Sequence, residues 1–200
     1  MHYFEKMSVF KIFLLILITA SCSNRQLLLE DFTNQPVKFA KQKVSYPNNE
    51  FTLFIPQNWD WKVEEYKNDN ILLGIDASSK PDKDGYIDLI SIQKVKSFSG
   101  TKDLKSEYEY LLNLTKAKSN NMKFVESGET NILKQKAFFI HLKSETNTYG
   151  ESEMISFIIE SDTEGIFYYL NAGASQTKDL KKNMSINIQS LKTFEINRTK

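Results

Sequence analysis

The chain has 200 residues, with 26 basic and 25 acidic side chains and a formal net charge of +1. This length suits one domain with a single core, and the interspersed charges do not favour nucleic acid or an anionic membrane surface as a partner. The two arginines, Arg25 and Arg198, lie in the tails, so the domain has no guanidinium for bidentate contact with phosphate or carboxylate. We therefore expect no nucleic-acid partner and no cofactor.

The first residues have the layout of an export signal. Lys6 and Lys11 supply positive charge, residues 12–18 form an unbroken apolar run, and small residues lead to Cys22. The run is too short to span a bilayer, which takes about 20 apolar residues, so it is typical of a cleaved signal peptide. Met7 begins a shorter version of the same signal and is an alternative start.

The stretch from Ile18 to Cys22, "ITASC", resembles a bacterial lipobox. In such signals the thiol is alkylated with diacylglycerol, the chain is cut before the cysteine, and the new amine is acylated. Thr19 stands where leucine is commoner. The resemblance implies that Cys22 is lipidated, that residues 1–21 are removed, and that the acyl chains anchor the protein firmly in a membrane. Because Ser23 and not aspartate follows, we expect the periplasmic face of the outer membrane.

Cysteine and histidine are scarce in the rest of the chain. Cys22 is the single cysteine, so lipidation leaves no thiol for a disulfide and the core alone must hold the fold. Without the signal, 24 basic and 24 acidic residues remain (26 less two, 25 less one), and His141 is the single histidine. A site of several histidines therefore cannot form.

Residues 22–43 are polar and mixed, without a sustained period, which favours a tether ahead of a domain at 44–196. As a coil, about 20 residues span roughly 25 Å. Three consecutive leucines at 27–29 leave a second interpretation open, in which the segment docks on the domain or starts a short helix.

Alternating apolar residues in the domain predict a series of short strands. Trp61 and Val63 alternate with charged residues, so we expect both to face the core. Short turns join several successive strands, so the sheet should be mainly antiparallel. The expected strands cover 51–55, 61–66, 70–76, 85–95, 123–127, 131–133, 136–145, 152–161 and 165–174.

Two segments change to helical spacing. The first covers 104–118, with Thr101 as the expected N-cap. The second covers 176–190 and should bury a stripe of Leu180, Met184, Ile188 and Leu191. The fold class is therefore α+β, a mainly antiparallel sheet flanked by helices.

The stretch "FTLFIPQNWDWK", the helix at 104–118 and a terminal helix ending in "IQSLKTFE" resemble the Mog1/PsbP-like fold family, which includes DcrB-type bacterial lipoproteins. The resemblance covers about residues 44–195. It implies an α-β-α sandwich and a binding or assembly role. It offers no catalytic residues to transfer to this chain.

Two groups are candidates for chemistry. Asp82, Asp84 and Asp88 surround Gly85 like part of a calcium loop, although the bidentate glutamate of a full loop is missing; the competing interpretation is a solvated hairpin tip. His141 could serve as a base for a serine such as Ser156, but no Gly-x-Ser-x-Gly elbow presents a nucleophile. The competing interpretation is a strand histidine on a half-covered face.

Trp59 and Tyr66 are the candidates for a recognition surface, since aromatic residues anchor interfaces. We therefore predict a lipid-anchored cell-envelope protein, not an enzyme, that has a non-catalytic binding or assembly role. Its partners are the membrane, through the anchor, and an unknown envelope protein or ligand. The alternative is an envelope hydrolase or metal-dependent enzyme that uses His141 or the turn from Asp82 to Asp88.

Overall fold

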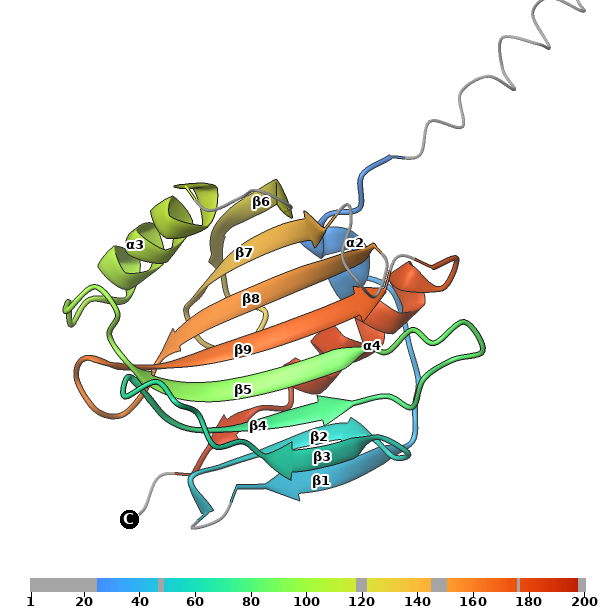
Figure 1. The fold of residues 1–200 in the computed structure, drawn as a ribbon, viewed down its shortest axis with the longest axis horizontal. Helices are drawn as coiled ribbons and strands as arrows, with labels where there is room; N and C mark the ends of the chain where they lie inside the picture. The colour runs from blue at the N-terminus through green and yellow to red at the C-terminus, as the bar shows by residue number, and fades with distance from the viewer. Residues whose placement is uncertain (1–24, 47–48, 118–121, 145–150, 176, 198–200) are drawn as a thin grey trace, which may run out of the picture.

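The structure is a computed structural model that describes residues 25–46, 49–117, 122–144, 151–175 and 177–197. Its main feature is a seven-stranded sheet in the order β3-β4-β5-β9-β8-β7-β6, in which all neighbouring strands are antiparallel (Figure 1). The strands are β3 (Asp60–Val63), β4 (Ile71–Ser78), β5 (Leu89–Lys96), β6 (Met122–Thr130), β7 (Ala137–Ser144), β8 (Ser152–Glu160) and β9 (Ile166–Ser175).

Different layers cover the two faces of this sheet (Figure 1). Helix α3 (Leu104–Ala117) covers one face over β7 and β8. The other face carries α4 (Leu180–Leu191), the short helix α2 (Leu29–Thr33) and a second, three-stranded sheet. That sheet has the order β1-β2-β10 and comprises β1 (Lys41–Ser45), β2 (Phe51–Pro56) and β10 (Glu195–Ile196).

The predicted α+β class with a mainly antiparallel sheet is confirmed, with differences in detail. Strands β1 and β10 were not predicted, and residues 131–133 form a turn in which the Lys134 N–H donates to the Asn131 carbonyl. The expected first strand, β2, belongs to the second sheet. Its inward residues Phe51 and Leu53 are buried in the same core as α4, so alternation correctly identified the buried face but not the sheet that contains it.

Each face of the large sheet has its own core. Under α4, the predicted stripe of Leu180, Met184, Ile188 and Leu191 is buried, as expected. Under α3, the Tyr108 ring stacks on Phe138 with centroids 4.6 Å apart, and its hydroxyl donates to Ser127 at 2.7 Å. The cap of α3 is Asp103 and not Thr101, because the Asp103 carboxylate accepts the Ser106 N–H at 2.7 Å, the bond that an N-cap makes.

The prediction of a tether over 22–43 is wrong for the described residues of that segment. Helix α2 packs on the domain, with Leu29 and Phe32 buried in the core under α4, and β1 begins at Lys41. The three leucines supported the alternative of a docked short helix. Burying two such side chains contributes about 2 kcal/mol each, enough to hold a five-residue helix that would not form alone.

The expectation that Trp61 and Val63 face the core is also wrong. Both lie on β3 and are 40% exposed. Strand β3 is the outermost strand of the large sheet and pairs with β4 along one side only. Alternation places the two side chains on the face shared with Ala77 and Ile75, but at this edge the covering layer does not bury them.

Position 74 in β4 requires glycine, because neighbouring atoms lie too close to leave room for a side chain. A Cβ atom there would lie 2.6 Å from the backbone oxygen of Ile92 and 2.8 Å from the Tyr66 hydroxyl. At Gly128 in β6, in contrast, the nearest atom to an added Cβ would be the Phe139 Cε1 at 3.6 Å, an ordinary contact.

Gly74→Ala should therefore lower the free energy of unfolding by about 1–3 kcal/mol, as overpacking does in a close-packed interior. Gly128→Ala is the matched control and should be neutral or slightly stabilising, because glycine weakens a strand. Urea unfolding of both variants measures the difference. Equal midpoints for the two variants would contradict the close approach at Gly74.

Candidate functional site

The large sheet buries a histidine between two carboxylates on the face under α2. His141, on β7, is 0% exposed. Its Nε2 lies 3.0 Å from Oε2 of Glu153 on β8, and its Nδ1 lies 3.5 Å from Oε1 of Glu126 on β6. Each ring nitrogen thus faces a carboxylate oxygen, and an imidazolium can donate to both where a neutral ring can donate to only one.

Helix α2 and the residues before it close this His141 cluster (His141, Glu126 and Glu153). The Leu29 N–H donates to Oε1 of Glu126, and the Gln26 side chain donates to Oε1 of Glu153 at 3.4 Å. The Phe32 ring meets the imidazole edge-on, with ring centroids 5.9 Å apart. The cluster therefore joins the N-terminal segment to three strands of the sheet.

The geometry does not form the predicted pair of His141 and Ser156. On β7 and β8, His141 lies opposite Ile155, while Ser156 lies opposite Ile140. Directly opposed residues share a face and successive residues alternate, so the serine and the imidazole are on opposite faces of the sheet. The expected half-covered face is also wrong, because α2 covers the histidine completely.

A second buried carboxylate, Glu107 of α3, fixes the loop between β5 and α3. It is fully buried and accepts hydrogen bonds from the hydroxyls of Ser97, Ser99 and Tyr169 at 2.6–2.7 Å, and from the N–H groups of Phe98 and Ser99. Burial alone would raise the pKa of Glu107, but these donors together lower it below its ordinary value. Burial, together with the hydrogen bond to Glu107, raises the pKa of Tyr169.

The carboxylates of the turn from Asp82 to Asp88 have separate structural roles. Oδ1 of Asp82 accepts the N–H groups of Asp84 at 2.9 Å and Tyr86 at 3.0 Å, which holds the hairpin tip between β4 and β5. Asp88 accepts the Ser175 N–H at 3.4 Å, and burial raises its pKa. Among the described residues, no group of three or more His, Cys, Asp or Glu is arranged to hold a metal ion.

Trp59 and Tyr66 do not lie on one surface. Trp59 is half-buried against the core under α4, and its carbonyl accepts the Gln42 side chain at 2.7 Å. Tyr66 packs over Gly74 on the opposite face, which α3 does not cover at this point. Burial raises the pKa of Tyr66, while the neighbouring Gln93 and Ser91 act the other way. The exposed tryptophan is Trp61.

Sequence reasoning missed Glu107, Glu126 and Glu153. Each looks like an ordinary surface glutamate, because the residues that it meets come from other strands or loops. Periodicity gave a signal at two of them: Glu153 follows strand alternation with the inward residues Ile155 and Phe157, and Glu107 lies three residues after Leu104 on the buried face of the helix. The lipidation candidate Cys22 lies outside the described residues. No helix within the described part of the chain is both long and apolar enough to span a membrane.

No family model and no curated protein matches the chain by sequence. Among solved structures it is similar to the cyanobacterial PsbP protein (CyanoP) of Synechocystis, with 8% identity, a TM-score of 0.56, and coverage of 80% of this chain and 95% of that one. It is also similar to the Ran-binding protein Mog1p of Saccharomyces cerevisiae, with 10% identity, a TM-score of 0.52, and coverage of 80% and 96%. At these identities the likeness shows the fold alone, and that fold is the Mog1/PsbP-like fold that the sequence resemblance implied.

Glu107→Gln should destabilise the domain by about 2–4 kcal/mol at neutral pH, because the buried donors lose a charged acceptor. Since the folded-state pKa lies below the unfolded value, the carboxylate contributes stability above about pH 4.5 that is lost as the pH falls through the folded pKa. The difference between wild type and variant should therefore shrink in acid.

Urea unfolding between neutral and acidic pH measures this dependence. Glu109→Gln is the matched control, because Glu109 is an exposed glutamate two positions along the same helix. An identical pH profile for the two variants would show that the Glu107 bonds do not stabilise the fold.

Proposed function

We propose that this chain is a lipid-anchored cell-envelope protein with a non-catalytic binding or assembly role. The anchor is Cys22, and because Ser23 follows it, the outer membrane is the proposed location. The fold of the domain supports a binding role by analogy only, since Mog1p is a Ran-binding protein of the same fold and one fold serves many functions.

The observation that carries the proposal is the exposed edge strand β3. Trp61 and Val63 are each 40% exposed, on a strand whose outer edge pairs with no strand of the described chain. An unpaired edge with apolar side chains is a template for a partner strand or an apolar protein surface. Tryptophan is also enriched among the residues that dominate binding energy. We propose β3 as the partner-binding site, in place of Trp59 and Tyr66 together.

The enzyme alternative has weaker support. His141 is fully buried beneath Phe32, and each ring nitrogen faces a carboxylate. A substrate would have to displace α2 before it could reach the imidazole. At the turn, Asp82 is engaged by two backbone N–H groups, so a cation there would compete with the bonds that shape the hairpin.

The anchor is tested by Cys22→Ala. Labelling cells with a radioactive or clickable fatty acid should mark the wild-type protein and leave the variant unmarked and uncut, because the thiol accepts the lipid before cleavage. Ser21→Ala is the control and should be labelled like the wild type, since it keeps a small residue before the cut. A mature-sized wild-type protein without label would contradict the anchor.

The binding site is tested by replacing Trp61 and Val63 together with lysine. Both positions are exposed, so the cost in stability should be below about 1 kcal/mol, while the apolar edge acquires charge. Crosslinking in intact cells, followed by purification of the lipidated protein, should recover a partner with the wild type and lose it with the double variant.

Tyr110→Lys is the control for this experiment. Tyr110 is 41% exposed on α3, so it is matched in exposure but lies away from β3. The partner should be retained by this variant. Recovery of the same partner with both the double variant and the control would place the binding site elsewhere on the domain.

A further inference from the structure

The described chain attaches to the domain almost immediately after the anchor position. Arg25 lies three positions after Cys22 and forms a salt bridge with Asp31 of α2 at 3.0 Å. The next residue, Gln26, donates to Glu153, and Leu29 is buried. Three residues span at most about 10 Å when fully extended, so a lipid on Cys22 cannot lie far from the domain surface.

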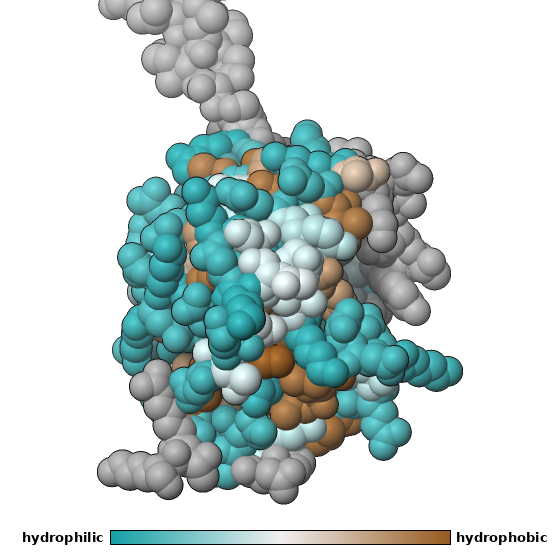
Figure 2. Space-filling model, turned by 90° about the vertical axis from the view of Figure 1, so that its left-hand side faces the viewer, coloured by the Kyte–Doolittle hydropathy of each residue, from teal (hydrophilic) through white to brown (hydrophobic). Residues whose placement is uncertain are grey.

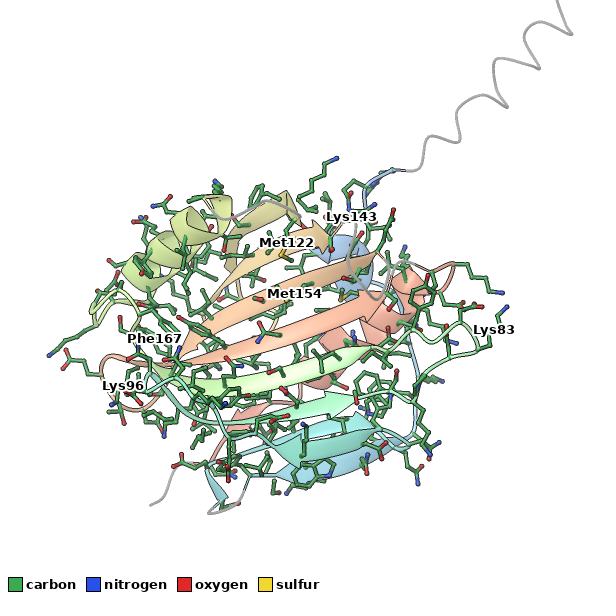
Figure 3. The ribbon with its side chains drawn as sticks, viewed as in Figure 1. Lys83, Lys96, Met122, Lys143, Met154 and Phe167 are labelled. Carbon is green, nitrogen blue, oxygen red and sulfur yellow. The ribbon has the colours of Figure 1, made fainter. Side chains whose placement is uncertain are left out.

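The attachment lies at one end of the large sheet. At this end Ser144, Ser152 and Ser175 are opposite one another across β7, β8 and β9, and Glu153 is the neighbour of Ser152. At the other end, Lys96 lies opposite Ile166. Strands of this length separate the two ends by about 25–30 Å. Figure 3 shows Lys143 beside the start of the described chain and Lys96 on the other side of the molecule.

We propose that the Ser144–Ser152–Ser175 end of the sheet lies directly against the phospholipid headgroups of the membrane that holds the anchor. This inference rests on the proposed lipidation of Cys22. Because α2 docks on the domain, three positions and not about 20 residues separate Cys22 from the first described contact of the chain. The bilayer is therefore the surface that this end of the sheet meets. Lys178 and Lys182 are exposed nearby, but so is Asp179. The proposed contact therefore depends on the short distance along the chain from Cys22 to Arg25 and not on a strong charge attraction.

The far end of the sheet then faces away from the membrane. It carries the β8–β9 turn and the loop before α3 (Figure 1). Figure 2 views this end of the molecule and shows hydrophilic side chains over much of the surface, a pale area of intermediate hydropathy in the middle, and hydrophobic areas toward the bottom and near the top. Hydrophilic side chains there suit contact with water, and the domain as a whole stands upright with its strands directed away from the bilayer.

Fluorescence quenching in reconstituted vesicles tests this orientation. Because Cys22 is the single cysteine and carries the lipid, a fluorophore can be placed by Lys178→Cys at the membrane end or by Lys96→Cys at the far end. The full lipidated chain is inserted into vesicles of phosphatidylethanolamine and phosphatidylglycerol that contain a headgroup-linked, short-range quencher. We expect strong quenching at position 178 and none at position 96.

A variant with 20 Gly and Ser residues inserted between Asn24 and Arg25 is the matched control. It leaves α2 and every described contact unchanged, but it gives the domain a flexible linker of about 25 Å. The quenching at position 178 should then be lost. If the protein floats with the vesicles but both positions are quenched equally, or if the insertion changes nothing, the orientation is wrong and the anchor stands. If the protein does not float with the vesicles, the anchor is wrong and the orientation falls with it.

Discussion

The burial of β7 on both of its faces is the constraint on which the rest of the structure depends. Phe138, Ile140 and Leu142 point to one side and Phe139 and His141 to the other, and all five are buried. Apolar surface left in water costs about 25 cal/mol per Å², so each face needs its own cover. One helix, α3, covers the first face. The second face of β7 is covered by α2 at His141, and the same face of the large sheet is covered elsewhere by α4 and the sheet β1-β2-β10, which is why the N-terminal segment becomes part of the domain.

Polar groups inside these two cores connect the layers. Glu107 connects α3 with the loop after β5 and with β9, and the His141 cluster connects α2 with three strands of the sheet. Buried charged groups are stable only when they are paired and hydrogen-bonded, and here their partners come from different layers. His141 and Asp82, on which the enzyme hypothesis depends, are both engaged in contacts that hold the fold together.

Two surface features distinguish one side of the domain from another. Docking of α2 holds Arg25, which lies three positions after the proposed anchor Cys22, close to one end of the sheet, while the apolar edge of β3 remains exposed on its side. In the proposed upright orientation, a partner that pairs with β3 would approach parallel to the membrane surface. Likeness of fold to PsbP and Mog1p identifies the scaffold, whereas the proposed binding site depends on residues such as Trp61 that belong to this chain.

Local patterns in the sequence determined the α+β class, most of the strands and the buried stripe of α4, because each depends on residues close together in the chain; the export signal with Cys22 stays a prediction. Tertiary structure alone decided the fate of residues that alternation treats alike. Trp61 and Phe51 both occupy inward positions of predicted strands, yet Trp61 lies at an uncovered edge of the large sheet, whereas Phe51 belongs to the second sheet and is buried in the core between the layers. The pairing of His141 with Glu126 and Glu153, and the docking of α2 upon them, likewise arise only when distant segments meet. Periodicity specifies which face of an element is apolar, whereas the layer that covers that face is set by the packing of the whole chain.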